Sequence, residues 1–196
     1  MLAPAYLHAW FSPGAGVAVV WEASGGADHY QLDRLDQGVW TSFAIYANNA
    51  ATWVGLPANR AFVFRVRAVD SAGNFSPYCA NYAIATTMTF SAVQRDVGVA
   101  FSHFDEIHAE INITRAAHND PNLTWRQILD NANFPGVPIP AFNTRIYAAH
   151  ILALRAALNT ALVNLGVPTS AFTDNLASPT MIKALHINEL QQRANY

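Results

Sequence analysis

Charged side chains are scarce in this sequence. Only 12% of the 196 residues are Asp, Glu, Lys or Arg, the formal net charge is −2, and Lys183 is the only lysine. Proteins that bind nucleic acid draw much of their affinity from basic contacts to phosphates, so this composition argues against a nucleic-acid partner. Hydrophobic residues make up 52%, yet no apolar run approaches the roughly 18 residues of a membrane span. We therefore expect a weakly charged protein without membrane insertion.

Cysteine is almost missing, and so are the common catalytic motifs. Cys79 is the single cysteine, so no internal disulfide can form and the fold must be held by packing. No G-x-S-x-G, phosphate-binding loop or G-x-G-x-x-G pattern occurs. The opening stretch "MLAPAYLHAW" has neither a charged start nor an apolar core, so we expect no Sec signal peptide. The sequence predicts no enzymatic activity and no cofactor.

What is present in the first half is alternation with a period of two. In "GVAVVWEAS", Val17, Val19 and Trp21 fall on one face, and "RAFVFRVRAVDSAG" repeats the pattern more clearly. Turn signals such as "SPGAG", "SGGAD" and "LDQG" separate the runs. Many short strands at this spacing predict an antiparallel β-sandwich with Trp21 in its core.

The order of these motifs resembles a fibronectin type III domain over residues 1–90. It runs through Trp21, "YQLDR", Trp40 and "ATWVGLPANRAFVFRVRAVDSAGNFSP" to a final "ATT". The resemblance implies a binding or spacer module rather than a catalytic one. That family usually carries Tyr six residues after the Leu of the "GL" pair, where Phe62 stands here. We expect Phe62 to keep the apolar packing and to lose one hydrogen bond, a cost of about 1 kcal/mol.

The second half, residues 91–196, contains three related stretches centred on His103, His150 and His186. Each histidine has an aliphatic residue four positions before it and another four after it; the triplets are Val99-His103-Ile107, Ile146-His150-Leu154 and Ile182-His186-Leu190. Spacings of four predict a small all-α domain of three repeat-related helices, with each histidine in the middle of an apolar face. A neutral imidazole there would pack while one nitrogen bonds the backbone of an adjoining loop. An asparagine follows each histidine by nine residues, a recurrence that the sequence does not explain.

The helical stretches resemble short modules with the pattern I-[KR]-A-x-H-[IF]-x-E-L-R. These modules follow immunoglobulin-like or fibronectin type III domains in bacterial surface and secreted proteins. "IKALHINELQ" matches nearly throughout, whereas "IYAAHILALR" has Ala153 in place of the Glu. The resemblance implies a cellular context and little mechanism.

The competing interpretation of the histidines is a metal site. His103 with Glu106, and His186 with Glu189, form H-x-x-E pairs such as some zinc enzymes use. A recurring ligand set should not lose a ligand, and the middle copy has lost its Glu. We therefore predict structural histidines and no bound metal.

Aromatic residues provide the candidate binding surface. The four residues Trp10, Trp40, Trp53 and Trp125 cannot all lie in the cores of domains this small, and we predict that Trp40, Trp53 and Trp125 form a surface for a glycan or a protein.

These features predict a non-enzymatic structural subunit of an extracellular assembly, most simply a phage virion component such as a capsid decoration, tail or fibre. Its partners would be other structural proteins or copies of itself. The basis is a surface-type domain in a chain without an export signal. The alternatives are a bacterial cell-surface or secreted adhesion or carbohydrate-binding module, and a hydrolase accessory domain or metalloenzyme.

Overall fold

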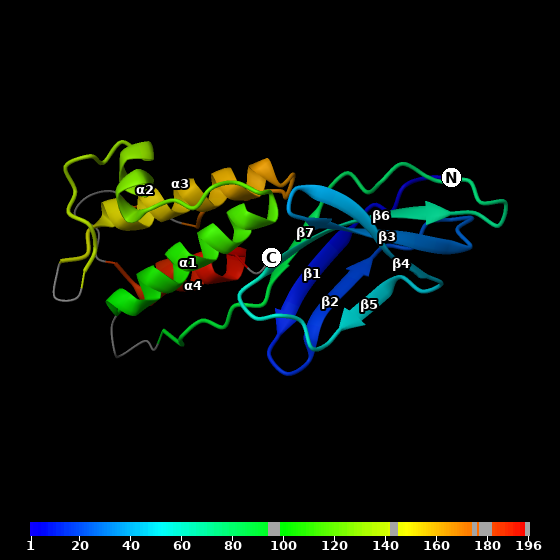
Figure 1. Cartoon of the computed structure of the whole chain (residues 1–196), viewed down its shortest axis with the longest axis horizontal. Helices are drawn as coiled ribbons and strands as arrows, with labels where there is room; N and C mark the ends of the chain where they lie inside the picture. Colours follow the sequence, from blue (N-terminus) through cyan, green and yellow to red (C-terminus); the bar gives the residue numbers. More distant parts are fainter. Residues whose placement is uncertain (94–98, 142–144, 174–175, 177–181, 195–196) are drawn as a thin grey trace.

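The computed structural model describes residues 1–93, 99–141, 145–173, 176 and 182–194, and within these it contains seven strands followed by four helices. The strands are β1 (Leu7–Ser12), β2 (Gly16–Trp21), β3 (His29–Asp36), β4 (Val39–Tyr46), β5 (Ala50–Trp53), β6 (Ala61–Val69) and β7 (Ala83–Thr86). The helices are α1 (Phe101–Ala117), α2 (Trp125–Asn131), α3 (Ala148–Asn164) and α4 (Ala184–Ala194). The molecule is elongated, with the strands at one end and the helices at the other (Figure 1). None of the described helices is long and apolar enough to cross a membrane.

The strands form two antiparallel sheets, one in the order β1-β2-β5 and the other in the order β4-β3-β6-β7. The predicted sandwich is therefore confirmed. The alternation seen in the sequence sorts residues correctly between the faces: Val17, Val19 and Trp21 of β2 are buried, and the residues between them are partly exposed. Trp21 lies in the core between the sheets, where its ring meets Tyr30 and Tyr46 edge-on at centroid distances of 5.6 and 5.9 Å.

The predicted all-α region is also confirmed, with one addition. The three histidine-bearing stretches form α1, α3 and α4, and α2 is a fourth, short helix between the first two. Thr124 caps α2 together with Gln127: the Gln127 N–H donates to the Thr124 hydroxyl, and the Gln127 side-chain oxygen accepts from the Thr124 N–H. The last strand ends at Thr86 and the first helix begins at Phe101, so the expected boundary at 90/91 falls in the connection between them.

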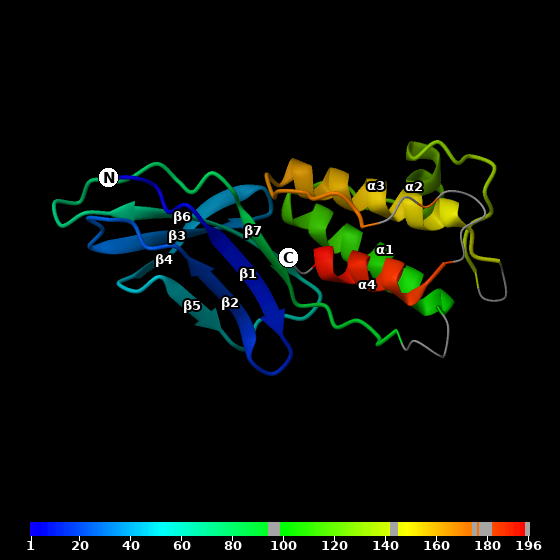
Figure 2. The same ribbon diagram turned by 180° about the vertical axis from the view of Figure 1, so that it is seen from behind.

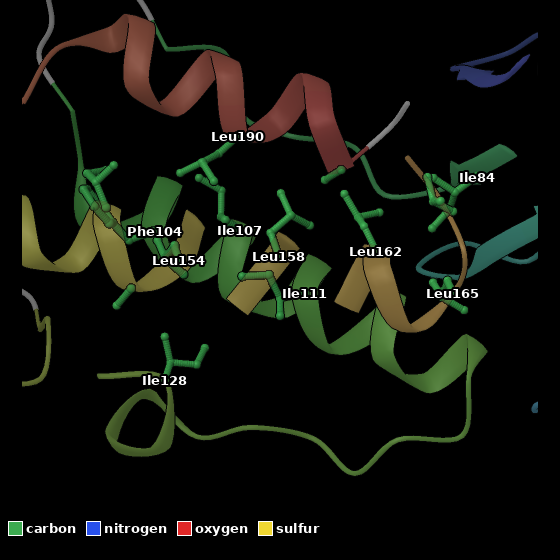
Figure 3. Close-up of a cluster of buried hydrophobic side chains, with 14 of the residues drawn as sticks. Ile84, Phe104, Ile107, Ile111, Ile128, Leu154, Leu158, Leu162, Leu165 and Leu190 are labelled. Carbon is green, nitrogen blue, oxygen red and sulfur yellow. The ribbon is translucent and has the colours of Figure 1, made fainter. Parts of the chain in front are cut away.

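The hydrophobic core of the helices continues onto the sandwich. Leu35, Val63 and Ile84 lie on the outer face of the four-stranded sheet, and they belong to the same buried cluster as the inner faces of the helices. Figure 3 shows Ile84 at the end of a row of helix side chains that includes Leu162 and Leu165. The molecule therefore has two hydrophobic cores. One lies between the two sheets, and the other lies between the helices and the outer face of the four-stranded sheet.

A hairpin tip forms a second contact between the two ends. The turn from β3 to β4 uses left-handed backbone at Gln37 (φ 49°) and Gly38 (φ 80°). The Gly38 N–H donates to the carbonyl of Ala117, the last residue of α1, at 3.1 Å. A Cβ at Gly38 would lie 3.2 Å from the carbonyl oxygen of His118, so glycine suits this position for both its backbone conformation and its small size.

The corner before β6 explains how the sandwich tolerates Phe62. Phe62 is 8% exposed and packs in the sandwich core, as its apolar side chain requires. The Thr87 hydroxyl donates to the Pro57 carbonyl at 2.6 Å and accepts from the Arg60 N–H at 3.1 Å. This hydroxyl comes from the residue after β7 and ties down the corner loop. The hydrogen bond that Phe62 cannot make thus has a counterpart at Thr87.

Candidate functional site

The three repeated histidines occupy one identical structural position. His103, His150 and His186 are each the third residue of their helix, and each backbone N–H donates to the carbonyl three residues earlier. In each case the imidazole Nδ1 accepts from the backbone N–H of that earlier residue: from Ala100 at 2.9 Å, from Tyr147 at 3.0 Å and from Lys183 at 3.1 Å. A Glu or Gln makes this contact in a capping box, and histidine takes its place here.

This geometry corrects the expected placement of the triplets. Val99, Ile146 and Ile182 lie before their helices rather than on the helical stripe, so the prediction that all three members share one helix face was wrong. Each of them packs against the helical core from the position before the cap, while Phe104, Ile151 and Ile187 are buried one residue after the histidine. An apolar pair in these two positions is typical of a hydrophobic staple. The repeated pattern therefore encodes a helix start.

The bonding of the rings fixes which ring nitrogen carries the hydrogen. Because Nδ1 accepts a backbone N–H, it cannot carry a proton, and the neutral ring holds its hydrogen on Nε2. In His150 this Nε2 donates to the Pro138 carbonyl at 2.8 Å, so the ring links the preceding loop to α3. Burial lowers the pKa of His150, and the Pro138 carbonyl opposes that shift in part.

The glutamates of the H-x-x-E pairs are bound elsewhere. Glu189 forms an ion pair with Arg155 of α3 at 3.1 Å and accepts from the Thr173 N–H at 2.8 Å. Glu106 accepts from the Ser91 N–H at 2.9 Å. Neither glutamate joins its histidine in a ligand set, and within the described residues no group of three or more His, Cys, Asp and Glu side chains could hold a metal ion.

The second and third repeats are joined by a buried cluster around Phe172. The guanidinium groups of Arg155 and Arg193 lie over the Phe172 ring, 4.3 and 3.7 Å from its centroid. Arg193 also donates to the carbonyls of Ser170 and Ala171. The Arg of one repeat thus pairs with the Glu of the next, and together with Arg193 they contact residues 170–173, which follow α3.

The repeated asparagines share no common role in the described residues. The Asn112 side chain accepts from the Leu123 N–H at 2.8 Å and donates to the Leu123 carbonyl at 3.0 Å, which fixes the loop before α2. Asn159 is partly buried, and its side-chain oxygen has no hydrogen-bond partner in the described part of the chain. Asn195 lies outside the described residues.

The three tryptophans expected at a binding surface all make packing contacts, and one of them is buried. Trp125 is 8% exposed and its indole N–H donates to Asp105, so the surface expectation was wrong for this residue. Trp53 is half-buried and stacks on Phe64 at a centroid distance of 5.4 Å. Trp40 is also half-buried and meets Tyr82 edge-on at 4.9 Å. Large aromatic rings fill the sheet faces and the junction between strands and helices in ways that period-two alternation does not reveal.

The outer face of the four-stranded sheet binds its own arginines. Arg65 lies between the rings of Trp40 and Tyr78, 4.4 and 4.0 Å from their centroids, and forms an ion pair with Asp33 at 2.9 Å. The Tyr78 hydroxyl donates to the same carboxylate at 2.5 Å. Asp33 is buried, so this network is an internal brace rather than a basic stripe open to partners.

A row of partly exposed aromatic residues lies on the edge strand β1 and just before it. Tyr6, His8 and Trp10 alternate along the outer side of this edge strand; Tyr6 is 53% exposed and Trp10 37% exposed. The rings of His8 and Trp10 stack at a centroid distance of 5.3 Å. The alternation of aromatic residues in "PAYLHAWF" is the sequence signal for this row. The rings of His8 and Trp10 border a groove of about 520 Å³, called the β1–α4 groove below.

A larger cleft of about 900 Å³ lies between the sandwich and α1, and several of its polar side chains have internal partners. Arg34 contacts Asp36 at 3.4 Å, and His108 and Asn112 both contact the Leu123 carbonyl. Residues of β3, of β6 and of the corner before β6 line one side of this cleft, and residues of α1 line the other. We therefore regard the cleft as the seam between the two ends of the molecule.

The strand order and core define the class of the first half: a two-sheet β-sandwich of the fibronectin type III kind, joined to four helices. Solved structures with similar sandwiches include a Fn3-like protein from Clostridium thermocellum, with 24% identity over 47% of this chain and 98% of that chain, and a TM-score of 0.35. Another is the sixth fibronectin type III domain of the human fibronectin type III domain containing protein 3, with 18% identity over 47% of this chain and 90% of that chain, and a TM-score of 0.38. A mutant of the FN3tt domain gives 20% identity over 45% of this chain and 97% of that chain, with a TM-score of 0.40. No protein-family model matches the chain, and no curated protein matches it significantly.

Proposed function

We propose that this chain is a non-enzymatic interaction module that serves as a structural subunit of an extracellular assembly, in the first instance a virion component such as a tail, fibre or capsid decoration. The observation that carries the proposal is the row of exposed rings on β1. It is mounted on a scaffold in which the repeated histidines and the H-x-x-E glutamates are already committed to internal bonds.

The scaffold supports this role because its two ends share a core. Leu35, Val63 and Ile84 connect the sheet to the helices, so a partner bound at β1 is held at a fixed position relative to α4. Binding sites placed on rigid elements lose less conformational freedom when a partner docks. An attachment subunit benefits from that rigidity.

The alternative is a cell-surface or secreted adhesion module, and the same exposed rings support it. The two proposals differ in where the protein resides. Mass spectrometry and immunogold imaging of purified particles test the virion form, and light scattering after size exclusion measures the oligomeric state. We expect the full chain in particles at stoichiometric amounts. A lone monomer that no particle contains would overturn the virion form.

A further inference from the structure

We infer that the β1–α4 groove is a binding site for a neutral oligosaccharide. The inference deepens the proposed attachment role by naming the chemical class of the partner, and it rests on that role for its biological meaning. One wall of the groove consists of rings from β1 and from the segment after β7; these are His8, Trp10, Phe11 and Phe90. The other wall belongs to α4, whose C-terminal part lies beside β1 in both ribbon views (Figures 1 and 2).

The wall from α4 presents only amide side chains. Asn188, Gln191 and Gln192 are spaced by three and four residues, which places them on one face of the helix. The side chains of Asn188 and Gln192 have no hydrogen-bond partner among the described residues, and Gln191 makes one long contact of 3.5 Å to the Ser91 carbonyl. Each amide offers both a donor and an acceptor, which matches a pair of neighbouring sugar hydroxyls.

The opposite wall supplies an apolar face for the ring of a sugar. Trp10 is 37% exposed at the edge of the sheet and lines the groove, so part of a large aromatic side chain is open to solvent there. The hydrogens on one face of a pyranose ring pack well against such a surface, while the hydroxyls around its rim point toward polar groups. The groove volume of about 520 Å³ lies within the roughly 300–1,000 Å³ that is common for small-ligand sites.

Charge decides which sugars fit. Of the residues that line the groove only His8 can titrate, and burial lowers its pKa, so the lining carries no charge near neutral pH. An acidic glycan or a phosphate group would find no cation there. A neutral glycan needs no cation, so the absence of charge from the lining does not weaken its binding.

A proline-rich peptide is the other ligand that aromatic grooves commonly accept. Proline has no backbone N–H, so such a peptide could not satisfy the acceptor oxygens of the three amides. Sugar hydroxyls both donate and accept, and they can satisfy each amide fully. The amide wall therefore favours the glycan.

The test is titration calorimetry of the full chain with cellohexaose, maltohexaose and chitohexaose, followed in parallel by tryptophan fluorescence. An acidic hexagalacturonide and a decaproline peptide are included as competing probes. We expect saturable binding to at least one neutral hexamer. No binding to any neutral hexamer, or binding only to the acidic sugar or to the peptide, overturns the inference.

Variants assign the binding to the groove. Trp10→Ala should weaken it by about tenfold or more, and the double variant Asn188→Ala/Gln192→Ala by about tenfold. Trp10→Phe keeps a ring and should lose less. Val54→Ala changes an exposed apolar residue that does not line the groove and should leave the affinity unchanged. Affinity that survives Trp10→Ala in a protein with a normal unfolding curve overturns the assignment.

The results separate this inference from the proposed function. A chain found in particles that binds none of these sugars keeps the virion role and loses the glycan site. A chain that binds a neutral hexamer through Trp10 but is absent from particles keeps the site and favours the adhesion module.

Discussion

At the scale of single residues, the Thr87 hydroxyl bonds the backbone of the sandwich corner, where the sequence predicted that a hydrogen bond was lost because Phe62 has no hydroxyl. It bonds the Pro57 carbonyl and the Arg60 N–H, and Thr87 itself is 5% exposed. Thr87→Val keeps the shape and removes the hydroxyl, which leaves both backbone groups without this partner. We expect the free energy of unfolding to fall by about 1–3 kcal/mol, measured by urea denaturation.

Thr87→Ser is the matched control because it retains the hydroxyl. It should lose much less stability than Thr87→Val. Equal losses in the two variants would mean that the methyl group, rather than the hydrogen bonds, stabilises the corner. In that case the Thr87 hydroxyl would not replace the hydrogen bond that Phe62 cannot make.

At the scale of the helix, the histidine at the third position is a cap whose effect should depend on how many bonds its ring makes. Among the described residues the His103 ring bonds the Ala100 N–H, whereas the His150 ring bonds both the Tyr147 N–H and the Pro138 carbonyl. His103→Leu should cost about 1 kcal/mol, as loss of a cap usually does. His150→Leu should cost about 3 kcal/mol because two backbone groups lose their partner.

Glutamine at the same positions separates capping from packing. Its side-chain oxygen can accept the backbone N–H as in an ordinary capping box, so His103→Gln should be nearly neutral in thermal unfolding. A His103→Gln variant as unstable as His103→Leu would contradict the capping role.

The pairing between repeats gives a second prediction at this scale. Arg155 and Glu189 are buried, so Arg155→Met leaves a carboxylate with only its Thr173 bond and the more distant Arg193. We expect a loss of about 3 kcal/mol from the single variant. The double variant Arg155→Met/Glu189→Met removes both charges and should recover much of that loss in a double-mutant cycle. Additive losses would show that the pair is not coupled.

The strands and helices also show which parts of the fold could be predicted from the sequence. Alternation identified β2 and β6 because each buries one face between the sheets, and the apolar spacing around the histidines identified α1, α3 and α4. The same spacing misplaced Val99, because an apolar residue four positions before a buried one fits both a helix stripe and a staple. The sequence did not single out Trp10 among the tryptophans, because its exposure depends on β1 lying at a sheet edge, which is a tertiary fact. Trp125 looked equally free in sequence, but its burial depends on packing between helices that only the fold specifies.

At the scale of the whole molecule, the seam between the sheet and the helices contains a buried acid. Glu110 of α1 is 0% exposed, and no well-formed hydrogen bond reaches either of its carboxyl oxygens from the described residues. Burial raises the pKa of Glu110 to about 7, and the nearby Thr86 hydroxyl of β7 offsets this in part. The folded protein therefore prefers this carboxyl protonated, whereas the unfolded chain ionises it at its ordinary pKa.

This preference predicts stability that falls as the pH rises. The contribution of Glu110 is fully present below its unfolded pKa of about 4.5 and is lost as the pH rises through about 7, a change of about 3 kcal/mol. The lowered pKa of His150 has the opposite effect, because its contribution is present above 6.5 and is lost as the pH falls. In the native protein these two pH dependences of the free energy of unfolding have opposite signs and partly cancel.

The variant Glu110→Gln should separate the pH dependence of stability due to Glu110 from that due to His150. The amide cannot ionise, so the variant should gain about 3 kcal/mol relative to the native protein between pH 4.5 and 8, measured by urea denaturation at each pH. The variant should also show the acid-side loss from His150 without the opposing slope, and adding His150→Gln should flatten that loss. Because the seam belongs to the core that both ends share, probes in the strands and in the helices should report the same shift. Parallel pH profiles for Glu110→Gln and the native protein would show that the buried carboxyl does not titrate with folding.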